Sequence, residues 1–195
     1  MQPIINLKEQ KAALRGQAKA YRRALSADEK ALLDAKITQN VLRLHQFRRC
    51  STLFTYVSTN IEVDTREIIR CALAEGKRVA VPRCTGESGI MQFHYITALQ
   101  ELEIGAFSVQ EPRADAPLAE YVNGAFMLVP AFLIDRAGYR IGYGKGYYDR
   151  YLAHFAGQTA GLCYQQGFVS KLWHGRYDKA VDVVVTENGI KTVAK

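Results

Sequence analysis

The N-terminal part of the chain has the periodicity of a helix. Apolar residues recur there at a spacing that places them on one helical face: Leu7, Leu14, Ala18, Tyr21 and Leu25. A cationic stripe runs beside this face and consists of Lys8, Lys11, Arg15, Lys19 and Arg22. Ser26 and Glu29 have the spacing of a capping box, so a second helix is predicted to begin there and to extend to about Leu44.

Predicted strands and helices alternate through the rest of the chain. Apolar or alternating runs predict strands at residues 52–57, 78–82, 91–96, 126–130, 159–164 and 181–185. Helices are predicted from about residue 64 to a stop at Gly76 and over residues 147–155, with a turn-rich loop over 105–117. The alternation predicts one three-layer α/β/α domain over residues 1–195, with a mostly parallel, Rossmann-like sheet.

Composition narrows the class of protein. The chain has 195 residues, of which 48% are hydrophobic, so one domain with a substantial core is expected. No run reaches the roughly 18 apolar residues of a membrane-spanning helix, and a secretory signal is missing at the N-terminus. The cysteines and histidines are dispersed, without the spacing of a zinc site or a redox pair. We therefore expect a cytoplasmic protein with reduced thiols and no membrane partner.

The positive charge is concentrated at one end of the sequence. Residues 1–50 hold 11 Lys or Arg and 4 Asp or Glu, and the whole chain has a formal net charge of +7. The remaining residues hold equal numbers of each sign. This distribution favours an anionic partner, which on charge alone could be a nucleic acid, a phosphate compound or another polyanionic small molecule.

A glycine-rich segment near residue 140 has the residue types expected of a phosphate-binding site. Glycines 138, 142, 144 and 146 allow backbone N–H groups to turn toward an anion, and the helix predicted after them adds its positive N-terminal end. Arg140 and Lys145 supply full charges, and Asp149 is placed to hold a magnesium ion on phosphates. The segment fits neither a Walker A loop nor a dinucleotide fingerprint. Glycine spacing alone would favour a flexible surface turn, but the interleaved charges and aromatic residues reverse this and favour a phosphate site.

These motifs resemble the 5-formyltetrahydrofolate cyclo-ligase family. The resemblance is carried by the stretch from Arg140 to Arg150, by Lys11 to Arg15, and by the segment from Ser58 to Thr65. Gln110-Glu111-Pro112 and residues 178–187 also fit, so the similarity spans nearly the whole chain. It implies the NagB/RpiA/CoA transferase-like type of sheet. One local departure is Leu172-Trp173-His174, where the family commonly has a Leu-Pro pair.

The resemblance also implies roles for particular residues. The expected catalytic residues are Lys145, Arg15 and Arg140. ATP would be bound by Lys11, Ala12, Ala13, Leu14, Arg15, Arg140, Ile141, Gly142, Tyr143, Gly144, Lys145, Gly146, Tyr147 and Tyr148. The folate would be bound by Val57, Glu62, Tyr143, Gly144, Lys145, Gly146 and Tyr147. Magnesium would be held by Asp149 and Asp178, and the choice between Asp178 and Asp182 for the second ligand is open.

The implied reaction converts 5-formyltetrahydrofolate to 5,10-methenyltetrahydrofolate with release of ADP and phosphate. Phosphorylation of the formyl oxygen makes phosphate a leaving group, and N10 of the same molecule then attacks the formyl carbon. The protein would align ATP and the folate and neutralise charge on the phosphoryl group. Magnesium is the expected cofactor, the two small molecules are the expected partners, and a monomer without nucleic acid is expected.

Other interpretations remain open at the level of the residues alone. The basic N-terminal helices could form a nucleic-acid-binding module, although the chain has no nucleic-acid motif. The same type of sheet also serves sugar-phosphate isomerases and coenzyme A transferases, and a fold does not decide between such functions. Lys11 and Arg15 could belong to a solvated helix face, and Tyr148 is expected to pack in the core more than to act in catalysis.

Overall fold

The computed structural model describes residues 7–87, 89–105, 109–120 and 123–193. Its largest element is a seven-stranded sheet in the order β12-β11-β9-β6-β1-β2-β3. The strands are β1 (Thr52–Phe54), β2 (Arg78–Cys84), β3 (Met91–Ile96), β6 (Ala125–Pro130), β9 (Gln158–Leu162), β11 (Val183–Thr186) and β12 (Gly189–Thr192). The five inner strands run parallel, and β3 and β12 pair antiparallel at the two edges. The prediction of a mostly parallel sheet is confirmed.

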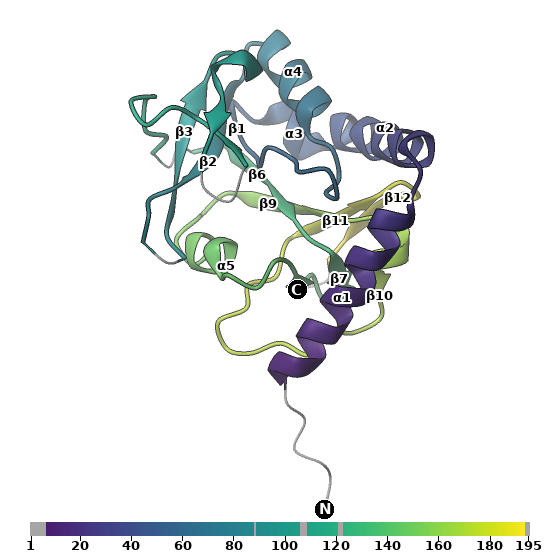
Figure 1. Cartoon of the computed structure of the whole chain (residues 1–195). Helices are drawn as coiled ribbons and strands as arrows, with labels where there is room; N and C mark the ends of the chain where they lie inside the picture. The colour runs from purple at the N-terminus through teal and green to yellow at the C-terminus, as the bar shows by residue number, and fades with distance from the viewer. Residues whose placement is uncertain (1–6, 88, 106–108, 121–122, 194–195) are drawn as a thin grey trace, which may run out of the picture.

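Helices cover both faces of this sheet. They are α1 (Leu7–Ala24), α2 (Ala27–Arg43), α3 (His45–Arg49), α4 (Arg66–Ala74) and α5 (Tyr147–Leu152). Along β6, Phe126 and Leu128 join the core cluster that contains α2, α3 and α4, whereas Met127 and Val129 join the cluster that contains α5. Side chains of one strand alternate between faces, so this apolar run is buried on both sides. Figure 1 shows the resulting layers.

Two predicted helix starts differ in how they are stabilised. Ser26 Oγ accepts a hydrogen bond from the Glu29 amide at 3.2 Å, and Glu29 Oε2 accepts one from the Ser26 amide at 2.9 Å. The predicted capping box of α2 is therefore present. At α4, Thr65 makes no side-chain cap; its hydroxyl instead donates to the carbonyl of Tyr56 at 2.6 Å. That bond ties the start of α4 to the segment that follows β1.

Several small elements were not predicted from the sequence. A three-stranded sheet in the order β10-β7-β8 is made of β7 (Leu133–Asp135), β8 (Arg140–Ile141) and β10 (Phe168–Val169). A second small sheet pairs β4 (Glu103–Ile104) with β5 (Gln110–Glu111), inside and beside the predicted loop of residues 105–117, of which residues 106–108 lie outside the described structure. Strand β1 ends at Phe54 and helix α5 at Leu152, both earlier than predicted.

The hairpin of β7 and β8 brings the glycine-rich segment to the end of β6. Asp135, which is 1% exposed, organises this hairpin. Its Oδ1 accepts hydrogen bonds from the amides of Ala137 and Tyr139, and its Oδ2 accepts one from the amide of Leu172, all at 2.9 Å. The carboxylate therefore fixes two separate loops at once.

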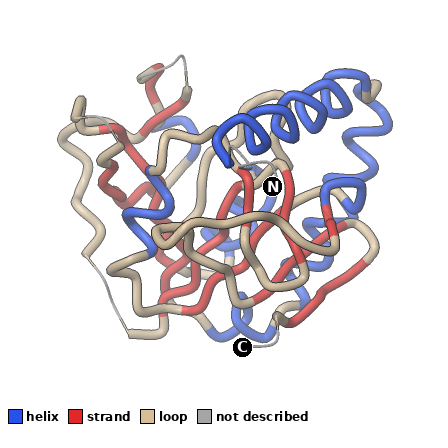
Figure 2. The backbone as a smooth tube through the Cα atoms, turned by 90° about the horizontal axis from the view of Figure 1, so that it is seen from below, coloured by secondary structure: helices blue, strands red, loops and turns tan. Residues whose placement is uncertain are grey.

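Helix α1 lies beside the ends of several strands and the long connecting loops (Figure 2). Its Ala18 packs with Phe132, Leu133 and Ile141 in a third apolar cluster. In the described part of the chain, none of the helices is long and apolar enough to span a membrane.

Candidate active site

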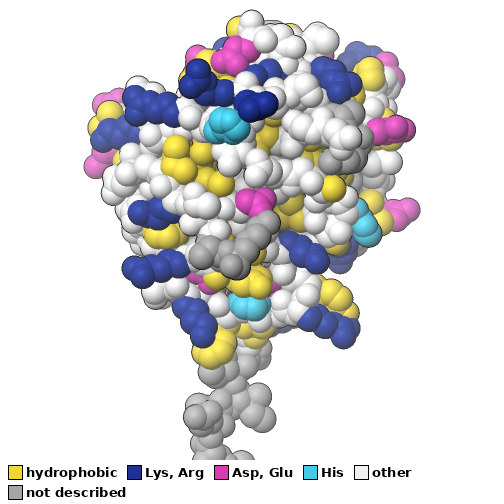
Figure 3. Space-filling model, turned by 180° about the vertical axis from the view of Figure 1, so that it is seen from behind, with side chains coloured by type: hydrophobic (Ala, Val, Ile, Leu, Met, Phe, Trp, Pro, Cys, Tyr) yellow, Lys and Arg dark blue, Asp and Glu magenta, His cyan; other side chains and the backbone are white. Residues whose placement is uncertain are grey.

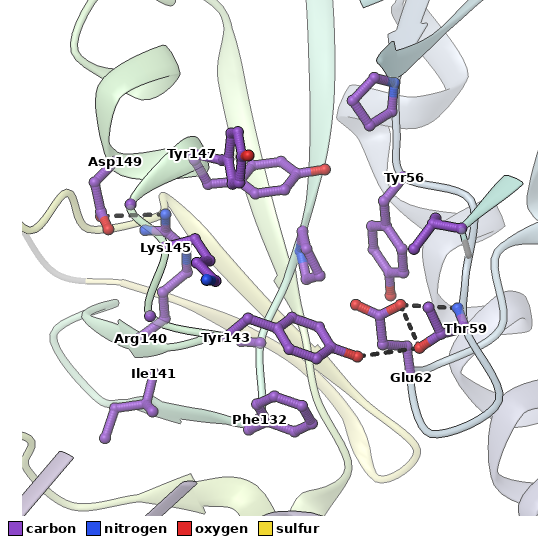
Figure 4. A pocket seen from close by; sticks show the side chains of 18 of the residues that line it. Tyr56, Thr59, Glu62, Phe132, Arg140, Ile141, Tyr143, Lys145, Tyr147 and Asp149 are labelled. Carbon is purple, nitrogen blue, oxygen red and sulfur yellow. Dashed lines mark hydrogen bonds and ion pairs between the residues drawn. The ribbon is translucent and has the colours of Figure 1, made fainter. Parts of the chain in front are cut away.

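A cavity of about 550 Å³ opens at the C-terminal ends of β1, β2 and β6. Its walls come from α1, from the segments that follow β1 and β2, from the connection between β6 and β7, and from the glycine-rich loop. This is the edge of a parallel sheet at which ligands of α/β proteins usually bind. Figure 4 shows the polar and aromatic side chains that face one another across it.

The glycine-rich loop forms one wall of the cavity, and two of its glycines have positive φ angles that other residues rarely adopt. Gly144 has a φ of +87° and Gly146 a φ of +76°, and Gly146 is the N-cap of α5. A Cβ atom at residue 144 would lie 2.8 Å from Nη2 of Arg15. Arg15 also donates from Nε to the carbonyl of Gly142 at 2.7 Å. The loop and α1 are therefore packed directly against each other.

The cationic stripe of α1 faces the cavity, except for Lys8, which is exposed. Lys11, Arg15, Lys19 and Arg22 all line it, as their spacing along one helical face allows. Lys11 and Arg15, for which a solvated helix face was the alternative, thus line the cavity. Ala12 and Ala13, predicted from the family range to bind ATP, are exposed and do not line the cavity. Leu14, from the same range, packs against the apolar cluster around Phe132.

Two carboxylates stand at the cationic end of the cavity. Asp149 Oδ1 lies 3.2 Å from Nη2 of Arg140 and accepts a hydrogen bond from the Lys179 amide at 3.2 Å. Asp178 Oδ2 lies 2.5 Å from Nζ of Lys11 and accepts from the Gly175 amide at 2.6 Å.

Burial alone would raise the pKa of Asp178, but the bonds from Lys11 and from the Gly175 amide outweigh it and lower the pKa. Burial lowers the pKa of the Arg140 guanidinium.

A buried carboxylate forms the opposite end of the cavity. Glu62 is 7% exposed, and its Oε2 accepts hydrogen bonds from the amide and the hydroxyl of Thr59, both at 2.8 Å. The Thr59 hydroxyl is also 3.1 Å from the Tyr143 hydroxyl, so the glycine-rich loop reaches this end too (Figure 4). Burial raises the pKa of Glu62 despite the two bonds from Thr59.

Aromatic and apolar groups separate the two ends. Tyr56, Phe132, Tyr143 and Tyr147 all line the cavity, and the rings of Phe132 and Tyr143 meet edge-to-face with centroids 4.9 Å apart. The ring of Tyr148 also lines it and packs against both main core clusters. Among the described residues, its buried hydroxyl finds no hydrogen-bond partner. This placement agrees with the expectation that Tyr148 packs in the core.

Most of the residues predicted to bind ligands therefore meet in one cavity. Beside those already placed, Val57, Ile141 and Lys145 line it. Sequence reasoning missed Phe132, included Thr59 only within the segment from Ser58 to Thr65, and identified Lys19 and Arg22 only as part of a charge stripe. Helical spacing from Arg15 was the one signal that could have placed these two cations in the site.

Comparison with known proteins decides the family. A model described as the 5-formyltetrahydrofolate cyclo-ligase family matches residues 7–187. The chain belongs to this family. Membership makes it a ligase of folate metabolism, and the nucleic-acid-binding, isomerase and transferase interpretations are not favoured. On the face shown in Figure 3, Lys and Arg side chains are spread among other types and form no single patch.

Individual relatives resemble the chain over most of its length. It is 26% identical over 196 residues to a 5-formyltetrahydrofolate cyclo-ligase from Mus musculus, and this alignment covers 94% of this chain and 97% of that protein. It is also 26% identical to an Escherichia coli (strain K12) protein of the same name, over 87% of this chain and 96% of that protein. The NMR structure of the 5,10-methenyltetrahydrofolate synthetase of Aquifex aeolicus is similar at a TM-score of 0.82 and 28% identity, over 95% and 93% of the two chains.

The cationic end of the cavity also fits a magnesium ion that is held together with phosphates. Magnesium is usually bound through one or two carboxylates, with the other ligands supplied by phosphate oxygens and water. Asp149 and Asp178 are such donors, and both line the cavity. No cluster of three or more His, Cys, Asp or Glu that could hold a metal alone occurs within the described ranges. The donor set therefore suits a metal that arrives with a polyphosphate.

Asp182, the alternative second ligand, has a different position. Its Oδ2 accepts hydrogen bonds from the amide and the hydroxyl of Thr159, both at 2.9 Å, and it does not line the cavity. It fixes the approach to β11 against the start of β9.

Substitutions at Asp178 and Asp182 should therefore change different properties of the protein: the magnesium requirement for Asp178 and the folding stability for Asp182. Asp182→Asn is expected to lower the free energy of unfolding by about 1–3 kcal/mol, because it weakens two partly buried hydrogen bonds. Its magnesium requirement should match that of the unmodified protein. Asp178→Asn should raise the magnesium concentration for half-maximal turnover several-fold. Denaturant unfolding measures the stability, and magnesium titrations of turnover measure the magnesium requirement. A magnesium requirement that changed only in Asp182→Asn would contradict the choice of Asp178 as the second ligand.

Proposed function

We propose that this chain catalyses the ATP-dependent conversion of 5-formyltetrahydrofolate to 5,10-methenyltetrahydrofolate, with release of ADP and phosphate. The observation that carries the proposal is the cavity of about 550 Å³, which has cations at one end and the buried carboxylate of Glu62 at the other. Family membership supports the same reaction.

The cationic end suits the phosphates of ATP. Lys11, Arg15, Arg140 and Lys145 line it together, so positive charge surrounds the place where the transferring phosphoryl group would lie. At Gly142, Gly144 and Gly146, no side chain covers the backbone that faces this end. Arg140 is held from behind by the carbonyl of Lys179 at 2.6 Å, which orients its guanidinium toward Asp149.

The opposite end suits the reduced pterin of the folate. A carboxylate accepts hydrogen bonds from adjacent N–H groups in pairs, and Glu62 is the buried carboxylate at this end. Val57, Tyr143 and Tyr147 provide apolar and aromatic surface for a flat ring system. Tyr143 belongs to both regions, because it lies in the glycine-rich loop and contacts Thr59 beside Glu62.

In the proposed reaction the formyl oxygen attacks the γ-phosphorus of ATP, and ADP leaves with the electrons of the broken P–O bond. N10 of the same folate then attacks the formyl carbon. Phosphate departs with the former formyl oxygen, and N10 loses its proton, which leaves the methenyl bridge. Lys145, Arg15 and Arg140 stabilise negative charge on the transferring group, and Glu62 holds the pterin so that both steps occur at one place.

Asp149 and Asp178 would hold magnesium when ATP is bound. The ion would supply positive charge to the phosphate oxygens. In the structure both carboxylates contact cations, Arg140 and Lys11, that also face the phosphate region. Phosphates that engage these cations would release carboxylate oxygens for the metal.

Three broader properties belong to the same proposal. The active unit is proposed to be a monomer. The small three-stranded sheet and the large sheet both border that cavity, which supports one domain. Cys50, Cys71, Cys84 and Cys163 are free thiols, which supports a reducing compartment such as the cytoplasm.

The reaction can be tested directly with the purified chain. It should form the methenyl chromophore from 5-formyltetrahydrofolate when both ATP and magnesium are present, and it should release one ADP for each chromophore formed. Omission of ATP should abolish the signal. A chain that formed no chromophore, and that instead bound RNA or DNA with steep salt dependence, would overturn the proposal.

Lys145→Ala tests the phosphate end. We expect turnover at saturating ATP to fall about 10²–10³-fold, because one charged group that stabilises the transferring phosphoryl group is lost. Folate affinity should change little. Lys36→Ala removes an exposed cation of α2 and serves as the matched control. Near-normal turnover of Lys145→Ala would exclude the assigned role.

Glu62→Gln tests the folate end and its pH dependence. Protonation removes the acceptor pair of Glu62, so the folate KM of the unmodified enzyme should rise as the pH falls through the pKa of Glu62. Burial raises this pKa, so the rise should occur at a higher pH than for an ordinary glutamate. In Glu62→Gln the folate KM should be high and should lack this acid limb. The measurement is steady-state kinetics between acidic and neutral pH, and an unchanged folate KM would refute the role.

A further inference from the structure

Arg22 is a nearly buried arginine of α1 that lines the folate end of the cavity. It is 5% exposed, and its Nη1 donates to the carbonyl of Ile61 at 3.0 Å while its Nη2 donates to the carbonyl of Ala131 at 2.5 Å. Ile61 directly precedes Glu62, and Ala131 directly precedes Phe132. One planar guanidinium therefore joins the two walls between which the pterin would lie.

Two aromatic rings pack against the guanidinium of Arg22. The central carbon lies 4.8 Å from the ring centroid of Phe132 and 5.1 Å from that of Tyr164. Tyr164 is fixed in turn, because its hydroxyl donates to Asp34 Oδ1 at 2.8 Å. Within the described ranges, no carboxylate lies close enough to Arg22 to form an ion pair.

A buried cation without a direct ion pair is costly unless negative charge lies nearby. Glu62 supplies such a charge, since it is buried beside the carbonyl that Arg22 binds. Burial raises the pKa of Glu62, the bonds from Thr59 lower it, and the positive charges of Arg22 and Lys30 lower it further. Arg22 thus favours the ionised form that a pterin needs as an acceptor.

We infer that Arg22 is a positioning residue for the folate: it fixes the location of Glu62 by joining the Ile61 and Ala131 carbonyls on the two sides of the folate end. The inference rests on the proposed function, in which Glu62 binds the pterin. Arg22 need not touch the substrate, because its effect passes through the backbone on either side of the ligand and through the electrostatic field at the carboxylate.

Arg22→Met separates this role from general folding. The folate KM should rise about tenfold to a hundredfold, the range for loss of buried hydrogen bonds from a charged group. The KM for ATP should stay within a factor of about two, since the phosphate end keeps its cations. Arg23→Met removes the same charge from the exposed neighbouring position and should leave both constants unchanged. A folded Arg22→Met with an unchanged folate KM would overturn the inference.

The pH profile provides a readout that a merely structural arginine would not move. Without the Arg22 charge, the acid limb of the folate KM should shift to higher pH, because the pKa of Glu62 rises further. Arg22→Lys keeps the charge but lacks the planar fork whose two nitrogens reach the two carbonyls separately. Its folate KM should therefore rise, while the acid limb of the pH profile stays at the same pH. The other titratable groups that face Glu62 from the packed elements are Lys30, Tyr56, Tyr143 and Tyr148. These groups are the same in all the variants.

The double variant Arg22→Met/Glu62→Gln distinguishes the possible failures. If Arg22 acts through Glu62, the double variant should have nearly the same folate KM as Glu62→Gln alone. Additive effects would show that Arg22 acts on the folate independently, and the inference would fall while the proposed function stood. An unchanged folate KM in Glu62→Gln alone would instead remove the role assigned to Glu62, and with it the basis of the inference.

Discussion

Three cations of α1 fasten this helix to parts of the chain that lie far along the sequence. Lys11 pairs with Asp178, Arg15 donates to the carbonyl of Gly142, and Arg22 donates to the carbonyl of Ala131. These contacts span 167, 127 and 109 residues, respectively. They complete the cavity, since without α1 the ends of the strands would lack one wall. The same charges that close the site are those proposed to receive ATP and to orient the folate end.

This arrangement places the site under a balance of charge. Cations close to one another repel, and burial makes each one less favourable. Carbonyl oxygens accept hydrogen bonds from Arg15 and Arg22, and carboxylates pair with Lys11 and Arg140, so each of these cations has a compensating partner. These partners hold the cations of the site in place, and under the proposed function bound phosphates would take over the contacts of Lys11 and Arg140.

The sequence predicted what regular patterns can encode. The central strands are apolar runs with two buried faces, the start of α2 has a capping box, and the glycine-rich segment indicated a phosphate site. Strands of two or three residues, such as β8 and β10, are too short to show any period, so the small sheet was not predicted. Ala12 and Ala13 were assigned from a continuous family range, whereas a helix presents only every third or fourth residue to one side. The role of Arg22 depends on Ala131 and Ile61, and no local pattern links these positions.

The strand order has a consequence for how the chain folds as it is made. Strand β1 lies between β2 and β6, yet β2 follows it closely in sequence and β6 begins only at residue 125. During synthesis the β1-β2-β3 portion can pair first, and the apolar β1 then presents an open backbone edge until β6 emerges from the ribosome. Nascent chains that pause in this interval are the ones most exposed to wrong pairing with a neighbour. Slow translation between β3 and residue 125 should therefore increase aggregation.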